Sequence, residues 1–127
     1  SVMDLCCGTG QVSNYLKCRG FKKIEGCDPY TNLEYQKRTG LKVYNYNFLR
    51  ISNMGFQKKY KYIICSFALH LCPKSILPKV LFMLSQCAEK LIIISPHKNP
   101  EINVYWEEEH KFISERVTTR VFKNKVI

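Results

Sequence analysis

A turn near the start of the sequence has the composition of a ligand-binding loop. In VMDLCCGTG, residues 2–10, an apolar run that carries Asp4 leads directly into Gly8 and Gly10. Glycine allows a sharp turn and lets a ligand approach the bare backbone. A helical pattern follows, and the first N–H groups of a helix have no partner within it. The stretch therefore predicts a ligand-binding turn between a buried strand and a helix.

An acidic residue follows the next apolar run at a spacing that suits a nucleoside. Asp28 lies 18 positions after Gly10, at the end of the predicted strand KKIEGCD. One carboxylate can accept hydrogen bonds from both hydroxyl groups of a ribose. A dinucleotide site would have a third glycine at position 13, which is Ser13 here, and Asp4 would repel a phosphate. The pattern therefore favours a positively charged nucleoside ligand without phosphate.

Alternating strand and helix patterns place these residues in an α/β fold. Strand–helix repetition with short connections predicts a three-layer, doubly wound, mostly parallel sheet with an antiparallel strand at the C-terminal end. Ligands of such sheets bind beyond the carboxyl ends of the strands. Strands are predicted at residues 1–7, 22–28, 41–48, 60–66, 90–96 and 115–125, and helices at 11–18, 32–40 and 73–88.

The spacing of apolar residues within these elements predicts which side chains are buried. In the first helix, Val12, Tyr15 and Leu16 share one face. The acidic stretch 107–110 predicts a solvated helical turn. In the helix at 73–88, the predicted core positions are Leu77, Val80, Leu81, Leu84 and Ala88.

Size and composition fit one ordinary globular domain spanning residues 1–127. The chain is 46% apolar and 24% charged, without a run of apolar residues long enough to cross a membrane. Seven cysteines without a disulfide framework predict free thiols and an intracellular protein of the cytoplasm or nucleus. Because no C-x-x-C pair occurs and the three histidines are scattered, we expect no metal site.

The charge balance favours acidic partners. Twenty Lys and Arg residues oppose ten Asp and Glu residues, which gives a net charge of +10. Nucleic acid is the first candidate partner for such a protein, and a plain lysine-rich surface is the alternative. The basic stretch from Arg116 to Lys125 is one place where RNA phosphates could bind.

Several motifs resemble those of class I S-adenosylmethionine-dependent methyltransferases. VMDLCCGTG resembles that family's first motif, written hydrophobic-hydrophobic-D-L-G-C-G-x-G. IEGCDPY resembles its second strand, and SFALHL and LIIISP resemble its fourth and fifth. The resemblance implies a methyltransferase that moves a methyl group from S-adenosylmethionine to an acceptor by in-line displacement.

The resemblance also implies roles for individual residues. Asp4 would orient the glycine loop, and Asp28 would bind the ribose hydroxyls. The remaining cofactor contacts would be the loop under the methionine part (Cys6, Cys7, Gly8 and Gly10), the adenine contacts (Pro29, Tyr30, Asn47 and Phe48) and the sulfonium side (Ser66 and Phe67).

The chain departs from the family pattern at several points. Cys6 stands where the first motif usually has glycine, and Asn47 stands where an acid usually accepts from the adenine amino group. The helix that normally precedes the first strand as a lid is missing, and the part after the fifth strand is compressed. We therefore expect a trimmed or minimal version of the domain.

The acceptor is left open between a small molecule and RNA. His70 is the first candidate for a general base because it follows a strand end, and His97 would face the acceptor after the fifth strand. FALH also resembles the corresponding strand of messenger-RNA cap guanine-N7 methyltransferases. The other class of function is an inactive binding or activating subunit with a protein partner.

Overall fold

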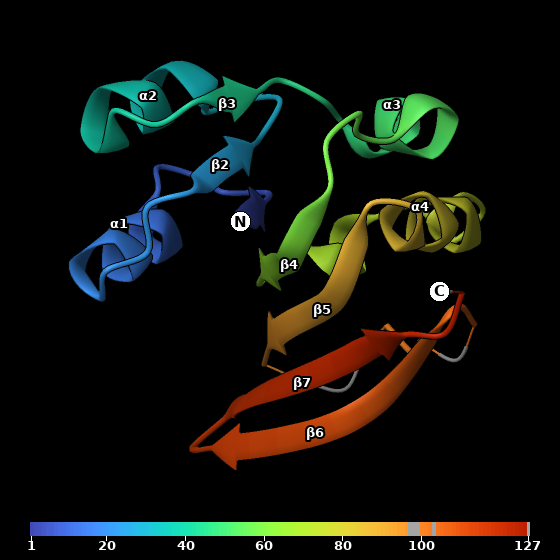
Figure 1. The fold of residues 1–127 in the computed structure, drawn as a ribbon. Helices are drawn as coiled ribbons and strands as arrows, with labels where there is room; N and C mark the ends of the chain where they lie inside the picture. Colours follow the sequence, from blue (N-terminus) through green and yellow to red (C-terminus); the bar gives the residue numbers. More distant parts are fainter. Residues whose placement is uncertain (97–99, 103, 127) are drawn as a thin grey trace.

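The molecule is built on one twisted seven-stranded sheet with helices on both faces (Figure 1). The structure is a computed structural model that describes residues 1–96, 100–102 and 104–126. Its strands are β1 (Val2–Leu5), β2 (Ile24–Cys27), β3 (Val43–Tyr44), β4 (Tyr60–Ser66), β5 (Ala88–Ser95), β6 (Trp106–Ser114) and β7 (Val117–Asn124). Its helices are α1 (Gln11–Cys18), α2 (Asn32–Thr39), α3 (Phe48–Met54), α4 (Leu77–Ser85) and a 3-10 turn, Leu69–Leu71.

The sheet topology confirms the predicted fold class. The strand order is β3-β2-β1-β4-β5-β7-β6, and β1 to β5 are parallel. β7 runs antiparallel to both β5 and β6. From β1 the chain moves outward to β2 and β3, then returns to β4 on the other side of β1. A reversal of strand order is where doubly wound sheets open a crevice at their carboxyl edge.

The larger core lies between the sheet and the helices α3 and α4. Leu84 of α4 and Ile51 of α3 are buried there against Ile63 and Leu91, two residues on the central strands. The opposite face carries a smaller apolar cluster, in which Val12 and Leu16 of α1 pack against the sheet. Since β4 and β5 are covered on both faces, their nearly continuous apolar sequences are explained.

Two predicted helix details are corrected by the structure. Tyr15 is 63% exposed, whereas Ser13 of the same helix is fully buried. The predicted helix at 73–88 is shorter, because α4 ends at Ser85 and Ala88 begins β5. Pro78 does lie in the first turn of α4, where its missing N–H removes no helical hydrogen bond.

The predicted third strand at 41–48 is mostly wrong. Only Val43–Tyr44 forms a strand, and α3 begins at Phe48 after a short connection. The side-chain oxygen of Asn47 accepts a hydrogen bond from the backbone N–H of Arg50 at 2.9 Å, so Asn47 is the N-cap of α3. Asparagine is among the strongest N-cap residues, and that was the sequence signal for this helix.

The acidic stretch 107–110 belongs to β6 and not to a helical turn. β6 is the outer strand of the sheet, and its side chains from Glu107 to Ser114 are mostly exposed. Trp106 anchors its start, because its indole N–H donates to the backbone oxygen of Leu81 at 3.0 Å in the buried core. An edge strand with one partner can carry charges at successive positions, which hides the strand pattern.

All seven cysteines are free. Burial raises the pKa of the Cys27 thiol to about 12, as expected of a thiol packed as a small apolar group. Among the described residues, no helix is long and apolar enough to cross a membrane.

Candidate functional site

A cleft of about 400 Å³ opens at the carboxyl ends of the central parallel strands. Its walls come from the loops after β1, β2 and β4 and from the start of α3, at the reversal of strand order. Eight of the residues singled out in the sequence line it: Cys6, Asp28, Pro29, Tyr30, Asn47, Phe48, Ser66 and Phe67. Asp4, Cys7, Gly8 and Gly10 do not line this cleft.

Asp28 is held in place by three backbone N–H groups. Its Oδ1 accepts from Tyr30 at 2.8 Å and from Thr31 at 3.1 Å, and its Oδ2 accepts from Gly8 at 3.2 Å. The Thr31 hydroxyl donates to the Gly8 carbonyl at 2.6 Å, which ties the two loops together. Asp28 is 9% exposed and lines the cleft, so its carboxylate is fixed at the cleft wall.

Two residues of the cleft wall have a backbone conformation that side chains rarely adopt. Cys6 has a φ of 58° and Phe67 a φ of 57°, and each follows the end of one of two adjacent strands. Such left-handed residues cost about 1–3 kcal/mol each and gather at functional sites. Both residues in this conformation line the cleft. Phe67 stays 48% exposed, while its backbone N–H is fixed by the Ile94 carbonyl at 2.7 Å.

The two glycines of the loop have different physical roles. A Cβ at Gly8 would meet no atom within 4 Å, so the backbone there is open to a ligand. A Cβ at Gly10 would lie 2.4 Å from Cγ2 of Thr39 and 3.1 Å from the Tyr35 ring. Gly10 therefore serves the packing of α2 against the loop, a role that the sequence did not indicate.

This difference predicts unequal effects of two matched substitutions. Gly10→Ala combines a φ of 100° with the clash against Thr39, and we expect it to lower the free energy of unfolding by about 2–5 kcal/mol. Gly8→Ala has only the left-handed φ of 56°, and we expect about 1–2 kcal/mol. Urea unfolding measures both. Equal losses would contradict the packing role of Gly10.

Behind the loop, Asp4 is buried in a polar network. The Ser13 hydroxyl donates to Oδ2 of Asp4 at 2.7 Å and lies 2.8 Å from the Tyr35 hydroxyl. Asp4 is 1% exposed, and burial raises its pKa to about 6, although hydrogen bonds from Ser13 oppose the rise. Ser13, in the third-glycine position of a dinucleotide loop, is thus the partner of this carboxyl group.

Four further residues line the cleft that the sequence did not single out: Tyr46, Ile51, Ala68 and Leu71. Tyr46 follows β3, and the guanidinium of Arg50 lies 4.1 Å from the centre of its ring. Ala68 and Leu71 follow β4, so their position after a strand end was the available signal. Ile51 comes from α3, whose presence was not predicted.

The two histidines are placed differently. His70 does not line the cleft. It lies in the 3-10 turn and lines a neighbouring hollow of about 490 Å³ together with Cys72, Lys74 and Glu101. Ala68, just before that short turn, and Leu71, its last residue, line the cleft itself, so the turn lies between the two hollows. His97 lies outside the described residues.

In the part of the chain that the structure describes, no group of three or more His, Cys, Asp or Glu side chains is arranged to hold a metal ion.

Solved structures place this fold in a known class. A TehB-like S-adenosylmethionine-dependent methyltransferase from Corynebacterium glutamicum has a TM-score of 0.79 at 14% identity, over 98% of this chain and 79% of that one. Magnesium protoporphyrin IX methyltransferase from Synechocystis, crystallised with bound S-adenosylmethionine, has a TM-score of 0.69 at 16% identity, over 95% and 67%. An rRNA methylase from Escherichia coli has a TM-score of 0.69 at 13% identity, over 98% and 57%. The fold is that of the class I methyltransferases.

A sequence relative defines the family more closely. The uncharacterized protein C17A5.05c of Schizosaccharomyces pombe is 30% identical in sequence, and the alignment covers 98% of this chain and 71% of the relative. No family model matches the sequence. The chain belongs to the family of this fission-yeast protein, within the class I methyltransferase fold.

Proposed function

We propose that this protein binds S-adenosylmethionine in the cleft and transfers its methyl group to an acceptor. The observation that carries the proposal is that Asp28 lines the cleft and that its carboxylate is fixed by the backbone of the glycine loop. A ribose with two hydroxyl donors suits this acceptor. The neighbouring structures with the same fold include a methyltransferase crystallised with this cofactor.

The lining of the cleft fits the other parts of the cofactor. Gly8 does not line the cleft, but its N–H donates to Asp28 at the cleft wall and its backbone is open, which leaves room for the methionine part along the loop. Tyr30 is 89% exposed and next to Asp28, so its ring is free to cover one face of an adenine. The Phe67 ring would stabilise a nearby positive charge, as aromatic faces do. The volume of about 400 Å³ lies within the range of small-ligand pockets.

The chain needs few reactive groups for this chemistry. When bound, S-adenosylmethionine supplies a methyl group on a positively charged sulfur atom, which is a good leaving group. The residues of the cleft align the reactants and exclude water, and such positioning provides much of the rate of a displacement. His70 lines the neighbouring hollow, so it would accept a proton only from an acceptor that extends from the cleft past the 3-10 turn. The acceptor class is a small molecule or RNA.

Two measurements test the proposal. Calorimetry with S-adenosylmethionine and with its demethylated product should show micromolar binding of both, and no heat with either would overturn the cofactor site. Incubation with labelled methyl donor and fractionated extract should label RNA or a small-molecule fraction. Binding of the cofactor without any labelled product would refute transfer and leave the inactive binding subunit as the function.

Replacing His70 tests the proton-acceptor role. We expect His70→Ala to lower the rate of labelling by about a hundredfold while cofactor affinity stays constant, because general-base groups typically contribute that much. The control is Lys74→Ala, which changes the same hollow without removing a general base. Equal rates for the His70 variant and the unmodified protein would rule out that role.

A further inference from the structure

Six lysines gather at the edge of the sheet opposite the candidate cofactor cleft. Each lies just before a parallel strand or at its start: Lys22, Lys23, Lys42, Lys58, Lys59 and Lys61. Because β1 to β4 are parallel, their amino ends meet at one edge. All six side chains are exposed.

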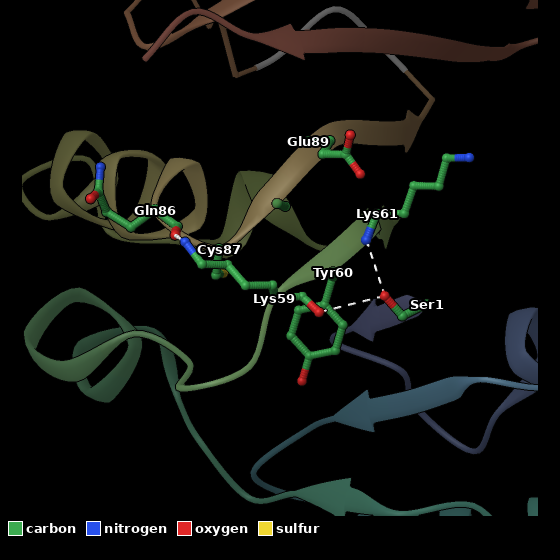
Figure 2. Close-up of a pocket in the computed structure, with 8 residues that line it drawn as sticks. Ser1, Lys59, Tyr60, Lys61, Gln86, Cys87 and Glu89 are labelled. Atoms are coloured by element: carbon green, nitrogen blue, oxygen red, sulfur yellow. Dashed lines mark hydrogen bonds between the residues drawn. The ribbon is translucent and has the colours of Figure 1, made fainter. Parts of the chain in front are cut away.

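These lysines line three neighbouring hollows that share lining residues, and we call the three together the lysine groove. The first, of about 320 Å³, includes Lys59 and Lys61 (Figure 2). The second, of about 400 Å³, shares Lys59 with the first and adds Lys22 and Lys23. The third, of about 180 Å³, shares Lys42 and Lys58 with the second. Tyr46 lines both the third hollow and the cofactor cleft.

The lysines that line the lysine groove outnumber its acidic residues, so the groove has a net positive charge. Among the described residues that line it, Glu25 and Glu89 are acidic, which leaves six lysines against two glutamates. Glu25 is already neutralised, because it accepts from Lys58 at 2.7 Å and from the Tyr60 hydroxyl at 2.8 Å. Partial burial raises the pKa of Glu25, but the hydrogen bonds from Lys58 and Tyr60 outweigh it, and the pKa falls below its ordinary value.

Several cations along the lysine groove are held in position. Lys59 donates to the carbonyl of Gln86 at 2.9 Å, as Figure 2 shows. The Lys42 ammonium lies 5.0 Å from the centre of the Tyr44 ring, and Arg50 covers Tyr46 in the third hollow. Because a cation covers a face of each ring, we expect Tyr44 and Tyr46 to position these cations and not to stack on bases.

We propose that the lysine groove binds the phosphate backbone of a single nucleic acid strand without reading its bases. If the partner were an acidic protein, the lysine groove would be expected to have an apolar centre, because the centres of protein interfaces are apolar and depleted in lysine. Of the large apolar side chains that are exposed among the described residues, only Met54 lines the lysine groove. A set of exposed lysines with a single exposed large apolar side chain among them matches a phosphate chain.

The basic stretch that the sequence suggested is a weaker candidate for this role. Arg120 of β7 is 5% exposed and donates to the carbonyl of Pro100 at 2.9 Å. Lys123 lies 3.6 Å from Glu107 on the neighbouring strand. β7 is an inner strand between β5 and β6, so the stretch from Arg116 to Lys125 does not present a row of exposed cations.

The test measures binding of the full chain to fluorescent 20-residue oligouridylate and oligothymidylate over a series of salt concentrations. The groove variant carries Lys23→Gln, Lys42→Gln and Lys59→Gln. The matched control carries Lys37→Gln, Lys79→Gln and Lys111→Gln, three exposed lysines outside the lysine groove, so both variants have the same net charge. Urea unfolding and calorimetry with S-adenosylmethionine check that the fold and the cofactor cleft are unaffected.

We expect both oligonucleotides to bind the unmodified protein with similar affinity. The groove variant should weaken binding about tenfold or more and reduce the slope of log K against log salt by about 2, at about 0.7 for each phosphate that a lysine no longer neutralises. Equal losses in both variants would show diffuse attraction by net charge and overturn the proposal. Absence of binding at low salt would overturn it too, as would tighter binding to polyglutamate or to phosphatidylserine vesicles. These outcomes are independent of cofactor binding.

Discussion

Replacing Asp28 with asparagine is expected to weaken S-adenosylmethionine binding by about a hundredfold or more. Asparagine has the same shape, so its Oδ1 can still accept from the backbone N–H groups of Tyr30 and Thr31. Its amide nitrogen, however, cannot accept from Gly8 or from a ribose hydroxyl. A hydrogen bond to a charged group contributes about 1.5–3 kcal/mol, so losing one ribose bond and the charge behind the other corresponds to a factor of about 10² or more.

Calorimetry measures this effect, and two controls make it specific. Glu34→Gln removes a charge from an exposed position on α2 that does not line the cleft, and we expect it to leave the affinity unchanged. Urea unfolding of Asp28→Asn shows whether the missing hydrogen bond from Gly8 disturbs the loop. A folded Asp28→Asn protein that binds the cofactor as tightly as the unmodified chain would remove Asp28 from the site.

The parts of the fold that the sequence predicted well are those with strong local signals. β4 is apolar on both faces, and α2 ends at Gly40, which has a left-handed φ of 70°. The failures have physical causes. α3 has only seven residues, and its capping Asn47 follows a strand of two residues, so one alternating pattern covered both elements. β6 is an edge strand, and solvent on its outer side allows consecutive acids.

The candidate site was predictable where motif residues lie directly at strand ends. Asp28 and Phe67 were placed in this way, and both line the cleft. Ile51 reaches the cleft only because α3 packs across the carboxyl edge, which is a tertiary effect. The role of Gly10 also depends on a distant element, since Thr39 and Tyr35 of α2 approach it. Contacts between segments far apart in sequence leave no local pattern to detect.

The buried Asp4 carboxyl group is expected to make stability depend on pH. Its pKa in the folded protein is about 6, against an ordinary value of 3.8, and burial is the main cause. Below about pH 4 it is protonated in both the folded and unfolded states. As the pH rises through 6, the unfolded chain releases this proton more readily than the folded one, so the free energy of unfolding falls. The difference between the two pKa values corresponds to about 3 kcal/mol, reached near pH 7.

Asp4→Asn should abolish this loss, because the amide keeps an acceptor for the Ser13 hydroxyl without acquiring a charge. Urea unfolding at pH 4 should give similar free energies for the variant and the unmodified chain, within about 1 kcal/mol. At pH 7 the variant should be more stable by up to about 3 kcal/mol. Because the two proteins share every other titrating group, the contributions of those groups to the pH dependence cancel when the two proteins are compared at the same pH. A constant difference between the two proteins from pH 4 to pH 7 would mean that the Asp4 carboxyl does not titrate in this range.

If Asp4 orients the loop for a cationic cofactor, the same substitution should also weaken cofactor binding at pH 7, so its gain in stability would come with a loss of function.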